Sequence, residues 1–272
     1  TADPTRRPLY GASVSIDLAA IRAARTAIAD VAKHTPVVSS VTLSEEIGGR
    51  IVFKAESLQR TGAFKIRGAM NKLAALGDVA ASGVTTGSAG NHAQALAFAA
   101  AHFGVPCRIF VPIGAPITKI DAARRFGADV SETGADVKAA VDAALAHAAI
   151  TALGRIGGAE AAEVLAKAKL SGSLRIDRDD AYLMCADSLL AEGQGSKAVA
   201  IYREMIDPAN TTWIRIAAYR GLIKAEEAKA VPYIVALLKD DDLNLQRAAG
   251  KFIAQTPGSA VTEALAKQVS SL

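Results

Sequence analysis

Hydrophobic and polar positions alternate with two different periods over the first half of the chain. Compact apolar runs, typical of buried strands, are separated by segments in which apolar residues recur every three or four positions, as in amphipathic helices. The predicted strands cover residues 51–55, 83–86, 107–111 and 128–130. The predicted helices cover residues 17–33, 42–47, 68–76, 91–103 and 115–126, with a further helix from about 135. This alternation favours an α/β fold with an open, mainly parallel sheet joined by right-handed crossovers.

The pattern changes near residue 148, after which strand signals end and apolar residues keep a helical period. The helices come in pairs, predicted at 149–156 with 159–168, 180–191 with 196–205, 213–225 with 230–238, and 244–254 with 260–269. The last two pairs repeat with a period of about 31 residues, the size of one helical-hairpin unit in a solenoid. The sequence therefore predicts two domains, an α/β domain over residues 1–147 and an all-α helical-repeat solenoid over residues 148–272. The second domain resembles HEAT-type repeats.

Composition narrows the classes of protein that remain. Half of the 272 residues (51%) are hydrophobic, which is enough for a buried core, and the Lys and Arg residues behind the net charge of +4 are scattered, which argues against a nucleic-acid partner. Cys107 and Cys185 lie far apart in apolar runs, which is typical of a reducing compartment, so we expect a cytoplasmic protein. No apolar run is expected to reach the length of a membrane helix. His34, His102 and His147 have no ligand spacing, so no metal site is predicted.

One lysine, Lys65, stands out because it lies between an aromatic residue and a turn of small residues at the start of a predicted helix. A lysine forms imines only when its ammonium can lose a proton near neutral pH, which requires partial desolvation or a nearby cation. Phe64 would supply the first and Arg67 the second. The alternative is a solvated lysine without a catalytic role, which is the commoner case for such a position.

The loop Ser88, Ala89, Gly90, Asn91 and His92 follows a predicted strand and opens a long helix. Backbone N–H groups at such a helix start point outward at the positive end of the helix dipole, an arrangement that suits a carboxylate or phosphate. Gly90 allows close approach of the ligand, and Ser88 and Asn91 add side-chain donors. The alternative is that Ser88 or Asn91 only caps the helix.

Both motifs occur together with other short segments in a fixed order. The segments are residues 35–36, 44–46, 56–69, 88–94, 111–112, 115–119 and 127–130. In this order and spacing, about the first 145 residues resemble the serine/threonine dehydratase family of fold type II pyridoxal-phosphate enzymes, whose fold is shared with the tryptophan synthase β-subunit. The resemblance implies pyridoxal 5'-phosphate as the cofactor.

By the same resemblance, Lys65 would form the internal aldimine, Phe64 would pack on the cofactor ring and Asn91 would meet the 3-oxygen of the cofactor. Residues Ser88 to His92 would bind the substrate carboxylate. The implied reaction is α,β-elimination from a small hydroxy amino acid, serine or threonine, in which Lys65 takes the α-proton and water leaves. The products are a 2-oxo acid and ammonia. Ala63 stands where the family often has a serine, two positions before the lysine.

The second half of the chain departs from the family pattern. The resemblance calls for a run of glycines around the cofactor phosphate and a Ser or Cys at the pyridine nitrogen, and neither is visible after Ile150. The glycines at 157–158 and 193–195 are predicted to be turns between helices. We therefore expect an incomplete site without its phosphate-binding half, and a strand at 51–55 that lacks neighbours and exposes an edge.

Three functional hypotheses follow from these patterns. The first is a pyridoxal-phosphate lyase of the dehydratase type. The second is a non-catalytic interaction protein that binds a protein partner on its helical repeats and carries a lyase-like remnant; Trp213 and residues 240–242 are candidate contacts, although a core residue and a solvated turn are the plainer interpretations. The third is a chimeric or truncated reading frame whose halves do not work together.

Overall fold

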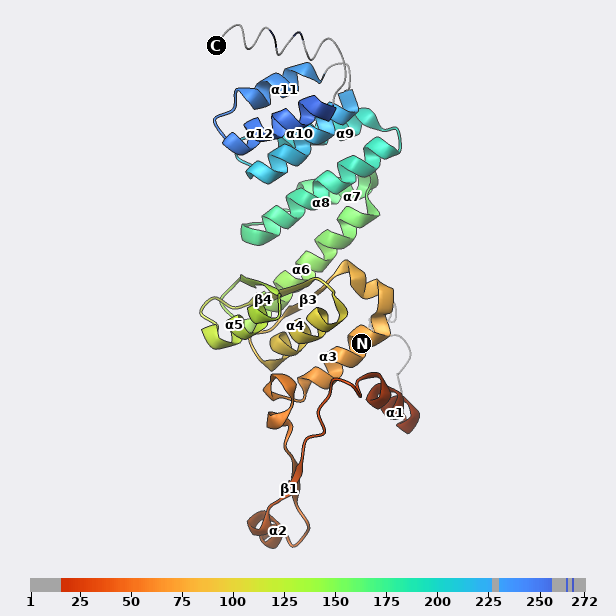
Figure 1. The fold of residues 1–272 in the computed structure, drawn as a ribbon, viewed down its shortest axis with the longest axis vertical. Coiled ribbons are helices and arrows are strands. Elements are labelled where there is room, and N and C mark those ends of the chain that lie inside the picture. Colours follow the sequence, from red (N-terminus) through yellow and green to blue (C-terminus); the bar gives the residue numbers. More distant parts are fainter. Residues whose placement is uncertain (1–15, 227–229, 256–262, 264–265, 267–272) are drawn as a thin grey trace, which may run out of the picture. The chain divides into compact units, whose positions relative to one another are not determined.

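The computed structural model describes residues 16–226, 230–255, 263 and 266, which divide between Ala144 and Leu145 into two compact units. The division falls inside a single long helix, α6 (Val137–Ile156) (Figure 1). The separate helix predicted from residue 149 is therefore wrong: no glycine or proline interrupts the chain between the start of α6 and Gly154, so one helix continues.

A three-stranded parallel sheet organises the first unit. Its strands are β3 (Val84–Gly87), β4 (Cys107–Val111) and β5 (Asp129–Glu132), in the order β3-β4-β5, with Val84 opposite Cys107 and Ile109 opposite Val130. The helices α4 (Asn91–Phe103) and α5 (Ile117–Arg125) are the crossovers between these strands. The parallel sheet expected for this part of the sequence is confirmed. Its carboxyl ends carry the loops in which α/β proteins bind ligands.

Alanine side chains fill much of the core of this unit. On α4 the residues Ala95, Ala97, Ala99 and Ala100 are at most 1% exposed, and they pack with α3 (Lys65–Leu76), which contributes buried residues such as Ile66 and Met70. Small side chains let helices approach each other and the sheet at short distance, so the packing fixes the starts of both helices. Those starts carry the two sequence motifs.

The strand predicted at residues 51–55 does not join the parallel sheet. It forms β2 (Val52–Lys54), which pairs antiparallel with β1 (Val37–Ser39), and the short helix α2 (Val41–Ile47) connects them. Figure 1 shows this β1–β2 arm, residues 37–54, projecting from the rest of the first unit. The expectation that this strand lacks neighbours is wrong, because β1 pairs with it; its large apolar side chains, including Val52 and Phe53, are nearly half exposed.

The remaining elements of the first unit are short. The helix α1 (Leu18–Ala27) ends earlier than predicted, and the 3-10 turns η1 (Glu56–Leu58), η2 (Arg60–Gly62) and η3 (Gly77–Ser82) link β2 to α3 and α3 to β3. Because α1 buries no residue within its own span, its apolar face is only partly covered.

Helices make up the described part of the second unit. They are α7 (Gly158–Lys167), α8 (Gly172–Ala191), α9 (Gly195–Met205), α10 (Thr212–Glu226), α11 (Val231–Leu238) and α12 (Leu243–Gln255). Sequential helices from α7 to α10, and α11 with α12, pack as neighbours around two apolar clusters. Gly157 and Gly193 lie between helices, as predicted, whereas Gly158 and Gly195 are the first residues of α7 and α9.

Three other expectations for this unit have different outcomes. The helix predicted from residue 180 begins earlier, at Gly172. The helix predicted at 260–269 lies outside the described residues, apart from residues 263 and 266. The assignment to HEAT-type repeats stays a prediction.

The expectation that no segment is long enough for a membrane helix is wrong by length and composition. Among the described helices, α6 has 20 residues and a mean hydropathy of 1.3 in its most apolar window. It is therefore long and apolar enough to span a membrane. The same test is also passed by core helices of soluble proteins, so it is weak evidence for a membrane segment.

Gly87, the last residue of β3, shows how tightly α6 covers this end of the sheet. A Cβ atom at Gly87 would lie 2.4 Å from the backbone N and Cα of Val141, in the first half of α6. Backbone atoms cannot rotate away as a side-chain tip does. A glycine is therefore required at the point where β3 turns into the 88–92 loop.

We expect Gly87→Ala to destabilise the first unit by about 1 to 3 kcal/mol, because the added methyl group overpacks against helix backbone. Gly68→Ala is the matched control: it lies inside α3 with no atom within 4 Å of its added Cβ, so it should be neutral or stabilise the unit by up to about 1 kcal/mol. Hydrogen exchange of the buried β4 amides measures the opening free energy of this unit alone. Equal effects of the two substitutions would contradict the close approach.

Candidate active site

Lys65 is the first residue of α3, and the chain reaches it through a strained turn. Thr61 has φ 62° and Gly62 has φ 70°, so two successive residues are left-handed just before Phe64. A β-branched residue rarely adopts this conformation, which costs on the order of 1 to 3 kcal/mol. The Oγ1 atom of Thr61 is also buried without a hydrogen-bond partner among the described residues. Strain and an unsatisfied polar atom often mark functional positions, and here both precede the lysine.

An ion pair holds the base of this turn. The guanidinium of Arg67 donates to Glu56 through Nε (2.9 Å to Oε2) and Nη2 (2.8 Å to Oε1), and the hydroxyl of Thr35 donates to the same carboxylate at 2.6 Å. The bond from Arg67, followed by that from Thr35, lowers the pKa of Glu56 to about 2. The Arg67 guanidinium is therefore paired with Glu56. The prediction that it acts as the cation beside Lys65 is wrong.

The surroundings of Lys65 also differ from the desolvated pocket expected from sequence. Phe64 is 58% exposed, and the Nζ of Lys65 lies 5.0 Å from the centre of its ring, an exposed cation–π contact. Lys65 is itself exposed. The first unit thus presents the amine on an open surface.

The 88–92 loop extends β3 and leads directly into α4. Ser88 donates its backbone N–H to the carbonyl of Phe110 at 3.0 Å, and its Oγ accepts from the N–H of Gly90 at 3.3 Å. The N-cap residue of α4 is Gly90, and no side chain caps the helix. The capping interpretation of Ser88 and Asn91 is therefore wrong. The first-turn N–H groups of α4 remain available for an anion.

Asn91 has a partner that sequence reasoning missed as a site residue. Its Oδ1 accepts a hydrogen bond from the Nζ of Lys119 at 3.0 Å. Lys119 lies on α5, 28 residues along the chain, at the carboxyl-end side of the same parallel sheet. The sequence signal for Lys119 was its place in the 115–119 segment of the family resemblance. Its contact with Asn91 could not be read from that segment, because the parallel sheet brings the two residues together. It adds a positive charge beside the loop.

His92 shows that the two motifs meet. Partial desolvation, followed by the positive charge of Lys65, lowers the pKa of His92 below its ordinary value. The helix that begins at Lys65, α3, packs against α4, which carries His92 in its first turn. The structure thus brings Lys65, Phe64 and His92 to one place, with Asn91 on the same first turn of α4 as His92.

Comparison with known proteins follows this geometry. Residues 28–166 match the family model of the pyridoxal-phosphate dependent enzymes. The chain belongs to this family. It is 45% identical to serine racemase of Oryza sativa subsp. indica over 115 residues, 42% of this chain and 34% of that protein. It is 45% identical to L-threonine ammonia-lyase of Thermotoga maritima over 131 residues, 48% of this chain and 33% of that protein.

Solved structures give related matches. A pyridoxal 5'-phosphate-dependent aspartate racemase is 32% identical with a TM-score of 0.46, over 52% of this chain and 50% of that chain. The processed form of threonine deaminase isoform 2 from Solanum lycopersicum is 27% identical with a TM-score of 0.43, over 64% of this chain and 54% of that chain. The chain spans about a third of the length of the curated relatives that it matches.

The donor set decides how well the family's cofactor fits. A primary amine, an aromatic ring, an amide and an open helix start suit the reactive aldehyde and ring of pyridoxal phosphate. The cofactor phosphate would require a separate set of donors. In the described part of the second unit, Gly154, Gly157 and Gly221 are each packed against side chains, with Tyr202 2.2 Å from a Cβ at Gly221. These glycines fill helix contacts. The residues of the first unit fit the ring end of the cofactor, and in the second unit Gly158, Gly193 and Gly195 have no atom within 4 Å of an added Cβ.

The charge of Lys65 can be tested at His92. Lys65→Met should raise the pKa of His92 toward its ordinary value without restoring it fully, because desolvation, the larger cause, remains. A histidine NMR titration would follow this shift. Lys72→Met removes an exposed lysine of the same helix and should leave the His92 titration unchanged. An unchanged pKa in Lys65→Met would show that the two motifs do not meet.

The Glu56–Arg67 pair predicts a dependence of stability on pH. The folded-state pKa of Glu56, about 2, lies below its ordinary value of 4.5, so this stabilisation is complete above about pH 4.5 and is lost as the pH falls toward 2. It should amount to about 1 to 2 kcal/mol after allowance for solvent screening. Glu56→Gln should remove that amount at pH 7 and flatten the acid limb of the thermal unfolding midpoint. Glu46→Gln, an exposed residue of α2, should leave the limb as in the wild type.

Proposed function

We propose that the first unit carries the lysine-bearing half of a pyridoxal-phosphate-dependent lyase site that acts on a small hydroxy amino acid, serine or threonine. The observation that carries this proposal is the packing of α3, which begins at Lys65, against α4, which begins at the 88–92 loop. Membership of the pyridoxal-phosphate dependent enzyme family supports it. The similar L-threonine ammonia-lyase of Thermotoga maritima points to the release of ammonia from a hydroxy amino acid.

Each residue has a definite task in this proposal. The Nζ of Lys65 would hold the cofactor and would accept the α-proton of the substrate. The open N–H groups at the start of α4, with the hydroxyl of Ser88, bind the substrate carboxylate, and Lys119 adds positive charge beside Asn91. Phe64 covers one face of the ring. The bound cofactor supplies the electron sink for the charge that the α-proton leaves behind.

The stoichiometry follows from α,β-elimination. The substrate loses its α-proton to Lys65 and its β-hydroxyl as water, and hydrolysis of the resulting enamine gives a 2-oxo acid and ammonia. The open surface at Lys65 affects this step, because solvent competes for the proton and weakens every charge interaction. We propose that the phosphate donors lie outside the described residues and that retention of the cofactor is therefore weak.

A second candidate function has its own observation. Trp213 is 73% exposed at the start of α10, so its interpretation as a core residue is wrong, and an exposed tryptophan is common where proteins bind one another. The turn at 240–242 was expected to be solvated, but two of its side chains have partners within the chain. Asp240 pairs with Arg215, and Asp242 accepts a hydrogen bond from the hydroxyl of Thr212 at 2.5 Å. The exposed Trp213 side chain is therefore the feature that supports a protein-binding role for the second unit.

Pyridoxal phosphate added to the whole protein tests the first candidate. We expect a visible absorbance band that borohydride abolishes, and a covalent adduct that peptide mass spectrometry places on Lys65. Lys65→Ala should lose both the band and the adduct, whereas Lys72→Ala, on an exposed lysine of the same helix, should keep them. Absence of the band at saturating cofactor would refute the lyase proposal and leave the protein-binding one.

A further inference from the structure

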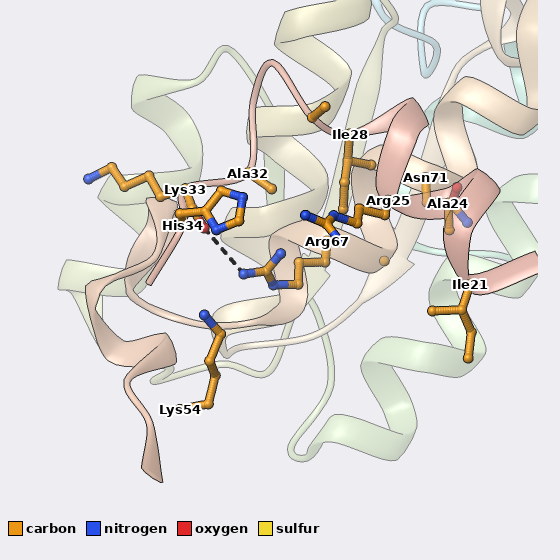
Figure 2. Close-up of a pocket in the computed structure, with 12 residues that line it drawn as sticks. Ile21, Ala24, Arg25, Ile28, Ala32, Lys33, His34, Lys54, Arg67 and Asn71 are labelled. Atoms are coloured by element: carbon orange, nitrogen blue, oxygen red, sulfur yellow. Dashed lines mark hydrogen bonds between the residues drawn. The ribbon is translucent and has the colours of Figure 1, made fainter. Parts of the chain in front are cut away.

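A separate cavity of the first unit lies between α1 and the beginning of α3 (Figure 2). Its volume of about 610 Å³ is in the range of pockets that hold small molecules. The walls come from α1, from residues 32–34, from Lys54 and from one side of α3. Neither Lys65 nor the 88–92 loop lines it. The cavity is therefore distinct from the proposed catalytic site.

Basic side chains gather at the mouth of this cavity. In Figure 2 the nitrogen ends of Arg25, His34, Lys54 and Arg67 turn toward the same opening, and no Asp or Glu is among the residues that line it. Arg67 is paired with Glu56, and Lys54 donates to the carbonyl of Thr35. Among the residues that the structure describes, no acidic side chain pairs with the Arg25 guanidinium.

The wall behind these groups is aliphatic. Ile21, Ala24, Ile28 and Ala32 border the cavity, and Ile21 is 55% exposed although it lies on the side of α1 that faces α3. An amphipathic helix gains stability by covering such a face. Here the apolar face of α1 borders open volume, and an apolar ligand would cover it.

Hydrogen bonds fix the rim of the cavity in advance. The side chain of Gln59 accepts from the backbone N–H of Lys33 at 2.9 Å and donates to its carbonyl at 2.8 Å. Arg67 donates to the same carbonyl at 3.3 Å. These bonds hold the segment that carries His34 against the residues before α3. A ligand would meet groups that are already in place, which reduces the entropy cost of binding.

We propose that this cavity binds a small aliphatic carboxylate. Its carboxylate group lies at Arg25, because Arg67 stays paired with Glu56, and its hydrocarbon part lies on Ile21 and Ile28. A guanidinium is planar and matches a carboxylate with two parallel hydrogen bonds. The aliphatic wall favours a ligand with a hydrocarbon body over inorganic phosphate, which would keep its hydration shell. This site does not depend on the proposed lyase activity.

Calorimetric titration of the whole protein with hexanoate tests the site. We expect one saturable site and a loss of affinity of about tenfold in Arg25→Gln, because a charge-assisted hydrogen-bond pair is removed. Arg22→Gln removes the same charge from an exposed position of α1 that does not line the cavity, and it should bind hexanoate as the wild type does. Circular dichroism checks that both variants remain folded.

The apolar wall requires its own comparison. Ile21→Ser should weaken hexanoate binding several-fold, because it removes apolar area that the ligand covers. Hexan-1-ol, which lacks the charge, and phosphate, which lacks the hydrocarbon, should each bind at least about tenfold more weakly than hexanoate. No saturable binding of hexanoate would overturn the proposal. So would equal losses in Arg22→Gln and Arg25→Gln, or phosphate binding as tight as that of hexanoate.

Discussion

The ion pair between Glu56 and Arg67 ties together three segments that are distant in sequence. Thr35 follows α1, Glu56 follows the β1–β2 arm, and Arg67 lies in the first turn of α3. A partly buried carboxylate must be paired to remain charged, and here two donors satisfy it at once. Loss of this pair would free the Lys65 turn and the rim of the α1 cavity together. One interaction therefore positions both candidate sites.

The pair also explains why Lys65 lacks the neighbouring cation that sequence suggested. Lys65 and Arg67 are two positions apart, and proximity in sequence favours a shared environment. On a helix, however, residues i and i+2 point to different sides. Arg67 turns to Glu56 and the cavity, while Lys65 turns to Phe64 and His92. Helical geometry separates the two charges and gives each its own site.

Local sequence patterns were sufficient to predict the strands of the parallel sheet and the helix that follows the 88–92 loop. The apolar runs and glycine-containing loops predicted β3, β4, β5 and the start of α4, because compact apolar strands and a thirteen-residue helix carry clear periods. The three-residue strands β1 and β2 are too short for a period to distinguish a parallel from an antiparallel partner. The contact of Lys119 with Asn91 depends on two crossovers, so tertiary packing decides it. The continuity of α6 follows from a local feature instead, the absence of Gly and Pro between Val137 and Leu153.

A correctly placed lysine and a retained cofactor are separate requirements. The binding free energy of the cofactor phosphate shows why. Each charge-assisted hydrogen bond to a phosphate contributes roughly 1.5 to 3 kcal/mol, so a cradle of several such bonds dominates the affinity for pyridoxal phosphate. Within the proposal, the first unit supplies the amine, the ring contact and the carboxylate loop, but not this term. The covalent link to Lys65 is reversible, and on an exposed surface water competes for it. Occupancy of Lys65 would therefore follow cofactor concentration, and an operating lyase requires that phosphate donors reach the site from outside the residues described for this unit.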